Sequence, residues 1–138
     1  MTKEEVKEEY KKREQDPHMK GKMKRMQREI ATSKSLQATK TATVVVTNPT
    51  HFAVALRYEL GMAAPVVVAK GQDFVAQRMK EVAKENGILI MENKPLARTL
   101  FKVCKVGQEI PESLYRAVSE IIRYVFLLKG KNLSRSRT

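Results

Sequence analysis

The sequence has few of the residues that build disulfide scaffolds or metal centres. The chain of 138 residues has no tryptophan and one cysteine, Cys104, so no disulfide can form within it. A single cysteine fits a reducing compartment such as the cytoplasm. His18 and His51 are the only histidines, and together with Cys104 they lack the spacing of a zinc site. We therefore expect no metal and no cofactor.

Long apolar runs and glycine-rich loops are also missing. No stretch approaches the roughly 18 apolar residues of a membrane span, and no basic and apolar leader marks a signal peptide. Gly61, Gly71 and Gly107 do not form a phosphate-binding loop. Aromatic residues make up only 6% of the chain, and no zinc-finger, basic-zipper or aromatic RNA-binding pattern is present. The sequence indicates no turnover enzyme.

Positive charge is what the chain has in excess. It carries 27 Lys and Arg against 15 Asp and Glu, a formal net charge of +12. Residues 1–40 hold 12 of these cations against 7 acids, and residues 41–138 hold 15 against 8, so the excess is spread along the chain. Such a surface is simply solvated, or it is attracted to an anionic membrane surface or to nucleic acid. A basic nucleic-acid-binding module is therefore the alternative function that the composition leaves open.

Residues 1–41 are predicted to be a charged linker helix followed by a flexible joint. Residues 2–31 are rich in charged residues, and Thr2 with Glu5 matches a capping box. Pro17 is expected to restart or bend the helix. Serine and threonine gather in residues 32–41, which predicts the joint. With so few apolar residues this segment cannot form a core of its own.

Residues 42–130 are predicted to be a compact α/β domain with a small mixed sheet of about four strands flanked by helices. Apolar runs predict strands at 44–47, 52–56, 66–69 and 88–91, and the first three runs are continuous, which is typical of strands covered on both faces. Phe74, Val75, Met79 and Val82 recur at helical spacing, which predicts a helix that carries them on its apolar face and stops at residues 86–87. Pro95 opens a second predicted helix, and Pro111 opens a third that stops at Gly130. Residues 131–138 are predicted to be a disordered tail.

One turn between two predicted strands has reactive chemistry of its own. It consists of Asn48, Pro49, Thr50 and His51. Pro49 has no backbone N–H, so the usual route of Asn ageing, attack by the next backbone nitrogen on the Asn side chain, is closed. The Asn48 side-chain nitrogen can still attack Asn48's own main-chain carbonyl, close a five-membered ring and expel Pro49 as a new amino terminus. This reaction becomes relevant where the turn holds a near-attack geometry.

The surroundings of Asn48 decide between a reactive and a structural turn. Pro49 fixes its own φ and keeps Asn48 extended, and tight hairpins prefer turns that proline cannot adopt, so we expect strain here. The His51 side chain is expected to donate to the developing oxyanion or to help remove a proton. The same four residues are also a common way to open a turn, in which case the bond is merely structural.

The segments around this turn resemble a known family. Asn48–His51 is followed by Phe-Ala-Val-Ala-Leu at 52–56, Val-Val-Val-Ala-Lys-Gly at 66–71 and Pro-Leu-Ala-Arg at 95–98. These segments resemble the cytoplasmic domain of the substrate-specificity switch proteins of flagellar and type III secretion, the FlhB/YscU family. The resemblance spans nearly the whole chain. The segments at 52–56 and 66–71 resemble the flagellar branch more than the injectisome branch.

The resemblance implies a location and a function. It implies that this domain follows a multi-span membrane domain at the cytoplasmic face of the bacterial inner membrane, so Met1 is expected to lie inside a longer protein or to begin an excerpt. It implies one self-cleavage between Asn48 and Pro49, with the fragments staying associated, and a switch of export from rod and hook proteins to filament-type proteins. Export-apparatus proteins and exported substrates are the implied partners, and no specific nucleic acid is expected. The candidate partner surface is formed by Pro95, Leu96, Ala97 and Arg98.

Overall fold

The computed structural model describes the backbone of residues 16–136 and side chains as far as residue 130. Contacts divide the chain into two units, residues 1–34 and 35–138. Most of the first part is helix α2 (Pro17–Thr39), which continues into the second. The helix begins at Pro17, where the sequence predicted a restart, and the Asp16 carboxylate accepts the His18 backbone N–H at 2.9 Å. The helix predicted over residues 2–15, with its capping box at Thr2 and Glu5, lies outside the described residues.

The flexible joint predicted at residues 32–41 is wrong for most of its length, because α2 continues to Thr39. The Thr39 hydroxyl donates to the Ser35 carbonyl at 2.7 Å, and the Thr41 hydroxyl donates to the Ala38 carbonyl at 2.7 Å. Hydroxyl side chains that bond back to the preceding turn are compatible with a helix. Serine and threonine therefore did not mark a break here.

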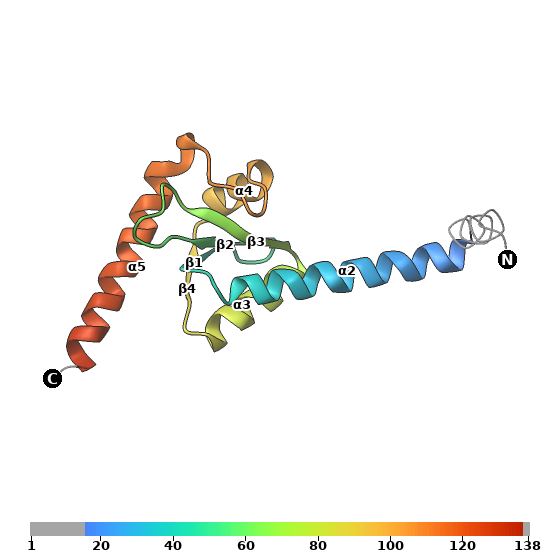
Figure 1. Ribbon diagram of the computed structural model, residues 1–138, viewed down its shortest axis with the longest axis horizontal. Coiled ribbons are helices and arrows are strands. Elements are labelled where there is room, and N and C mark those ends of the chain that lie inside the picture. The colour runs from blue at the N-terminus through green and yellow to red at the C-terminus, as the bar shows by residue number, and fades with distance from the viewer. Residues whose placement is uncertain (1–15, 137–138) are drawn as a thin grey trace. The chain divides into compact units, whose positions relative to one another are not determined.

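The second part is built on a four-stranded mixed sheet with the strand order β3-β2-β1-β4 (Figure 1). Its strands are β1 (Val44–Asn48), β2 (Phe52–Arg57), β3 (Val66–Gln72) and β4 (Leu89–Glu92). β2 pairs antiparallel with both β1 and β3, whereas β1 and β4 are parallel. The predicted α/β class and mixed sheet are confirmed. β1 and β2 are buried on both faces, as predicted, but the edge strand β3 alternates and runs on to Gln72.

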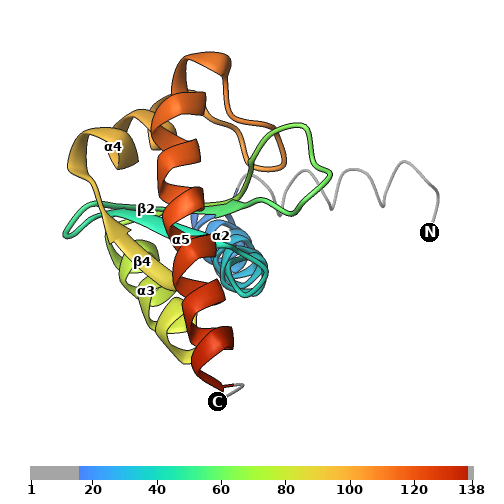
Figure 2. The ribbon, with the colours of Figure 1, turned by 90° about the vertical axis from the view of Figure 1, so that its left-hand side faces the viewer.

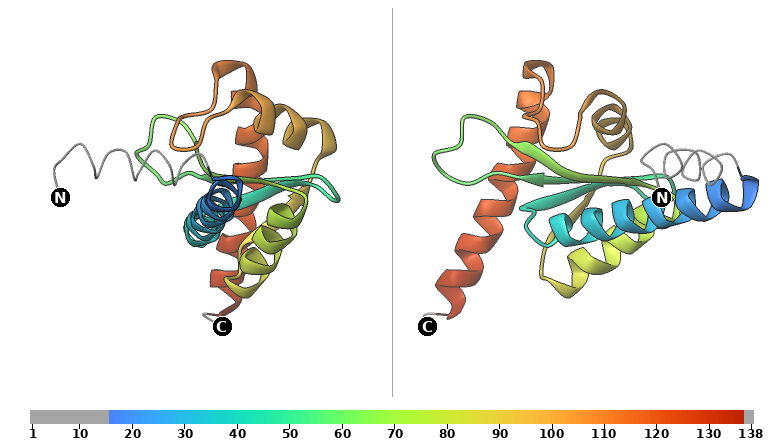
Figure 3. Two further views of the ribbon diagram at one scale, coloured as in Figure 1. Left: turned by 90° about the vertical axis from the view of Figure 1, so that its right-hand side faces the viewer. Right: turned by 45° about the vertical axis from the view of Figure 1, so that its right-hand side comes forward.

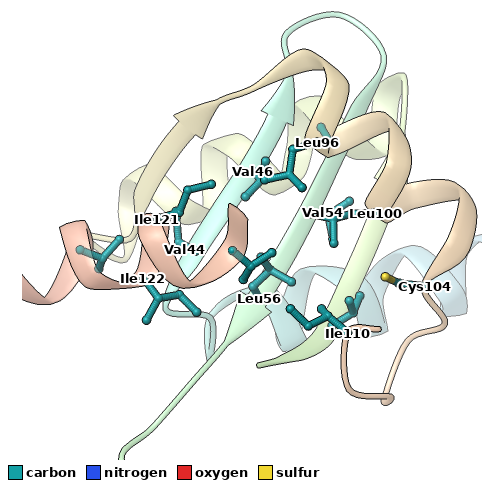
Figure 4. Packing of buried hydrophobic residues seen from close by; sticks show 14 residues of the cluster. Val44, Val46, Val54, Leu56, Leu96, Leu100, Cys104, Ile110, Ile121 and Ile122 are labelled. Atoms are coloured by element: carbon teal, nitrogen blue, oxygen red, sulfur yellow. The ribbon is translucent and has the colours of Figure 1, made fainter. Parts of the chain in front are cut away.

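Helices cover both faces of the sheet. Helices α4 (Lys94–Val103) and α5 (Tyr115–Ser136) lie on one face, and α3 (Phe74–Glu85) lies on the other (Figures 2 and 3). The 3₁₀ helix η1 (Glu112–Leu114) leads into α5. Figure 4 shows the first face, where Val44, Val46 and Val54 of the sheet meet side chains of α4 and α5. The labelled residues from the helical side include Leu96, Leu100, Ile121 and Ile122.

The opposite face is lined by small residues, so α3 packs close to the sheet. Ala53, Ala55 and Ala69 are buried against Met79 and its neighbours in α3. Gly71 of β3 is the tightest point, because a Cβ atom there would lie 2.6 Å from Val75 Cγ1 and 2.7 Å from Met79 Sδ. The missing side chain at Gly71 therefore leaves the space that Val75 and Met79 of α3 occupy.

Two helix predictions are wrong in detail. Phe74 was expected on the buried face of α3, but it is 72% exposed, because it lies 200° around the helix from the buried Ala76. α5 does not stop at Gly130 and continues to Ser136, through most of the residues predicted to be a disordered tail. A glycine inside a helix costs only about 1 kcal/mol relative to alanine, which a packed helix tolerates. The wider division of the chain into a linker, a domain and a tail stays a prediction.

Among the residues that the structure describes, no helix combines the length and apolar character needed to cross a bilayer.

Candidate functional site

The Asn-Pro turn joins the two inner strands of the sheet. Asn48 and Phe52 form the last residue pair of the β1–β2 ladder, so Pro49, Thr50 and His51 make a three-residue connection. The His51 backbone N–H donates to the Asn48 carbonyl oxygen at 3.1 Å. The predicted strain is not found in the φ angles of this turn. Among the non-glycine residues described, the one with positive φ is Asp73, at 52°.

Neighbouring elements hold the other carbonyl groups of this segment. The Thr47 carbonyl accepts the Asn93 backbone N–H at 3.0 Å, and the His51 carbonyl accepts the Asp73 backbone N–H at 2.9 Å. The Pro49 carbonyl accepts two side-chain donors of α3, Lys80 Nζ at 2.6 Å and Gln77 Nε2 at 3.0 Å. The backbone on both sides of the Asn48–Pro49 bond is thus fixed from outside the turn.

The side chains of the four motif residues differ in exposure. Asn48 and Pro49 are half-buried, whereas Thr50 and His51 are exposed. The His51 imidazole places Nδ1 3.7 Å from Asp73 Oδ1, a contact that is an ion pair only when the imidazole is protonated. The structure therefore assigns the two ends of His51 different contacts: its backbone N–H meets the Asn48 carbonyl, and its ring faces Asp73.

Sequence reasoning missed Asp73, Gln77 and Lys80. They lie in or beside α3, more than 20 residues after the turn, and belong to no recognisable motif. Their spacing of four and then three residues places them on one face of the helix, and this was the only signal available. That this face meets the turn depends on how β3 and α3 pack, which is a tertiary property.

The start of α4 lies beside the turn, because β1 and β4 are parallel and end at the same edge of the sheet. Asn93 joins the two elements: its backbone N–H binds Thr47, and its side chain caps α4 by accepting the Leu96 N–H at 3.2 Å. Of the four residues of the candidate partner surface, Pro95 and Arg98 are exposed and Leu96 and Ala97 are buried. Only the first pair is accessible to a partner.

A second link runs from the turn to the other end of α4. The Phe52 ring stacks on the Phe101 ring with centroids 4.6 Å apart. The Lys70 ammonium lies 4.9 Å from the Phe101 ring centroid and donates to the Phe101 and Cys104 carbonyls, each at 3.0 Å. Burial raises the pKa of the Cys104 thiol, and the Lys70 charge opposes this rise. Cys104 is thus a small buried apolar residue with a free thiol.

An apolar groove of about 490 Å³ lies at the opposite end of β2, between α5 and the connection to β3. Its lining includes Tyr58, Leu60, Pro65, Ile122, Phe126 and Leu127. Within the part of the chain that the structure describes, no three His, Cys, Asp or Glu side chains gather as metal ligands would.

The fold is that of a known class of bacterial proteins. The sequence model of the FlhB HrpN YscU SpaS family matches residues 1–125, and the chain belongs to this family. The flagellar biosynthetic protein FlhB of Yersinia enterocolitica is 48% identical over 130 residues, which are 94% of this chain and 34% of that protein. FlhB of Bacillus subtilis is 44% identical over 132 residues, 95% of this chain and 37% of that protein. The chain therefore spans about a third of the length of these relatives.

Solved structures show the same fold. The cytoplasmic domain of FlhB from Shewanella putrefaciens matches with a TM-score of 0.70 at 40% sequence identity, over 75% of this chain and 81% of that one. A mutated EscU C-terminal domain matches with a TM-score of 0.63 at 36% identity, over 65% of this chain and 91% of that one. The predicted family and fold are confirmed.

Proposed function

We propose that this chain is the cytoplasmic part of a flagellar export-apparatus protein that cuts itself once, between Asn48 and Pro49. The observation that carries this proposal is the 3.1 Å hydrogen bond from the His51 backbone N–H to the Asn48 carbonyl oxygen. During ring closure negative charge develops on this oxygen, and a fixed backbone donor stabilises such charge without reorganising. The surrounding hydrogen bonds hold the backbone of the turn in place for attack of Asn48 Nδ2 on the Asn48 carbonyl carbon.

The proposed reaction needs only groups of the turn and water. Asn48 Nδ2 gives up a proton and bonds to the Asn48 carbonyl carbon, whose oxygen becomes an oxyanion. When this intermediate collapses, the C–N bond to Pro49 breaks, and the Pro49 nitrogen takes up a proton and leaves as a secondary amine. Water then opens the five-membered ring and leaves Asn48 with a carboxylate. A folded copy of the chain performs this reaction once.

The sheet supports association of the two fragments after the cut. β1 belongs to residues 1–48 and lies between β2 and β4, which both belong to residues 49–138. Val44, Val45 and Val46 are fully buried there, and each contributes roughly 1.5 to 3 kcal/mol of apolar burial. Cleavage removes one covalent link at the end of the ladder and leaves these contacts in place.

The proposed switch follows from the new chain ends. The cut places a positive amine on Pro49 and a carboxylate on Asn48, beside the start of α4 with its exposed Pro95 and Arg98. A local change of charge can bias a docking surface between two states. We propose that export-apparatus proteins and their substrates read this surface, and that acceptance shifts from rod and hook proteins to filament-type proteins. The proposed location is the cytoplasmic face of the inner membrane.

The test is an intact-mass measurement in native and denaturing conditions. The wild-type chain should elute as one species in native buffer and separate into residues 1–48 and 49–138 in denaturant. The Asn48→Ala variant should remain one chain in both. A wild-type chain that stays uncut for days at neutral pH would contradict the proposed self-cleavage. Uncut protein with salt-sensitive binding to duplex DNA would favour the nucleic-acid alternative instead.

A further inference from the structure

Two side chains of helix α3 donate hydrogen bonds to Pro49, the first residue after the proposed cut. The Pro49 carbonyl oxygen accepts Lys80 Nζ at 2.6 Å and Gln77 Nε2 at 3.0 Å. The proline ring already fixes φ of Pro49, so two donors on its carbonyl fix the remaining torsion, ψ, as well. The whole residue on the leaving side of the bond is therefore held in one orientation.

A third contact of α3 fixes the far end of the turn. The Asp73 backbone N–H, at the start of the helix, donates to the His51 carbonyl at 2.9 Å. Asp73 directly precedes α3, and residues 77 and 80 lie on one face of the helix, so together they hold His51 and Pro49. Because His51 also carries the N–H that meets the Asn48 carbonyl, the position of α3 determines the geometry on both sides of the Asn48–Pro49 bond.

Lys80 adds charge to this geometry. Lys80 is half-buried, and its ammonium group contacts the turn one residue beyond the bond, where its field is less screened than at an open surface. The ring-closing step converts a neutral amide into an anionic intermediate, so a fixed positive charge nearby favours the intermediate over the ground state.

We propose that Lys80 and Gln77 are positioning residues for cleavage of the Asn48–Pro49 bond: Gln77 orients Pro49, and Lys80 both orients it and supplies positive charge. This inference rests on the proposed self-cleavage. The ordinary alternative is that the two side chains only tie α3 to the turn and affect stability alone. The two readings differ in what happens to the cleavage rate when the fold is unchanged.

The experiment follows cleavage in freshly synthesised chain, made by cell-free translation and sampled over time by intact mass. Lys80→Met removes the hydrogen bond and the charge, and it should slow cutting by about tenfold to a hundredfold, the scale of a lost near-attack geometry. Lys80→Gln keeps a donor without charge and should be intermediate. Lys80→Arg keeps charge and donor and should recover most of the rate. Gln77→Leu should slow cutting less than Lys80→Met.

The matched control is Lys84→Met, which removes an exposed lysine one turn further along the same helix. It should cut at the wild-type rate. Unfolding midpoints, measured in an Asn48→Ala background, show whether a rate change comes from lost stability. If Lys80→Met is too unstable to assess, Lys80→Gln and Lys80→Arg carry the comparison.

The outcomes distinguish the positioning role of Lys80 and Gln77 from the proposed self-cleavage on which it rests. Wild-type cutting with a slow Lys80→Met, an intermediate Lys80→Gln and a recovered Lys80→Arg supports the positioning role. Cutting at the wild-type rate in the Gln77→Leu/Lys80→Met double variant overturns this inference alone. A wild-type chain that does not cut overturns the proposed function and this inference together.

Discussion

At the scale of single residues, the hydrogen-bond donor on the Asn48 carbonyl is a backbone group. The sequence assigned this contact to the His51 side chain, but the structure places the His51 N–H on the Asn48 carbonyl and the ring beside Asp73. Any residue except proline keeps that N–H, so the backbone contact does not depend on histidine. The ring itself lies at the surface, with Nδ1 3.7 Å from Asp73 Oδ1 and its centroid 6.2 Å from that of the Phe52 ring.

We predict that His51→Ala slows cleavage but does not stop it. The loss should stay well below the roughly 10²-fold or more that removal of a general acid or base costs. Ring closure still needs the Asn48 amide to lose a proton, so the rate should rise with pH in both the variant and the wild type. Time courses at several pH values check this, with Asn48→Ala as the uncut control. Complete loss of cutting in a folded His51→Ala chain would make the imidazole an essential acid or base.

The motif residues could be predicted from the sequence because their chemistry is local. The reaction of an Asn-Pro bond follows from covalent structure, and Asn48 and Pro49 are neighbours in any fold. Lys80, which lies 2.6 Å from the Pro49 carbonyl, is an ordinary helical lysine when the sequence is read alone. Its contact arises because β3 leads into α3 at the same edge of the sheet as the turn. The sequence pattern predicts both elements but gives no measure of their packing.

At the scale of elements, the reach of α3 over the turn depends on its distance from β3. Gly71 lets the helix approach, since a methyl group there would overlap Val75 Cγ1 at 2.6 Å and Met79 Sδ at 2.7 Å. The methionine side chain is flexible and can move, but the β-branched valine is restricted in χ1. A larger residue at position 71 must therefore displace the helix, and with it the donors on Pro49.

We predict that Gly71→Ala destabilises the domain by about 1–3 kcal/mol, the usual effect of overpacking. It should also slow cleavage, because Lys80 and Gln77 move away from the Pro49 carbonyl. Denaturant unfolding in the Asn48→Ala background measures the stability, and intact mass in the Asn48 chain measures the rate. Gly130→Ala is the control: its Cβ meets nothing within 4 Å, and alanine should stabilise the helix by about 0.5–1 kcal/mol. Unchanged stability and rate in Gly71→Ala would contradict the role given to this close packing.

The strands and helices were largely predictable because their apolar periods are strong. The runs at β1 and β2 are continuous since both faces are buried, and α4 begins as expected near Pro95. The element ends were less predictable. Ser33 and Ser35 lie inside α2, which ends only at Thr39, and Gly130 lies inside α5, so residues that often end a helix did not do so at these positions. The helix propensities of single residues differ by only about 1 kcal/mol, so the favourable interactions of the rest of the helix outweigh one or two unfavourable residues.

At the scale of the whole domain, the proposed cut falls at the one connection between β1 and β2. β1 keeps partners on both sides, β2 by five residue pairs and β4 by four, whether or not the chain is continuous. The fold is thus expected to survive the cut, and the change is confined to the ends of the turn and the start of α4. In the proposed function, this separation is what allows one irreversible cut to alter a surface without unfolding the domain that presents it.

The last prediction concerns export in a cell whose protein carries Asn48→Ala. If cleavage is the switch, this cell should export rod and hook proteins and fail to change to filament-type proteins, although the domain stays folded. The physical reason is that Pro49 remains joined to Asn48, so neither the amine nor the carboxylate forms beside Pro95 and Arg98. Secretion of both substrate classes into the medium, compared by immunoblot, measures the changeover. Lys84→Met serves as a control that should export like the wild type.

Two separately expressed pieces distinguish the cut itself from the chemistry that makes it. One piece ends at Asn48 and carries the preceding part of the protein, and the other begins at Pro49 once its initiator methionine has been removed. Because β1 inserts between β2 and β4, the pieces should assemble and restore the changeover with no reaction at the bond. Normal export of filament-type proteins by the uncut Asn48→Ala chain would show that cleavage is incidental. The switch would then have to act through a surface that the cut does not change, and the new chain ends at Asn48 and Pro49 would lose their proposed role.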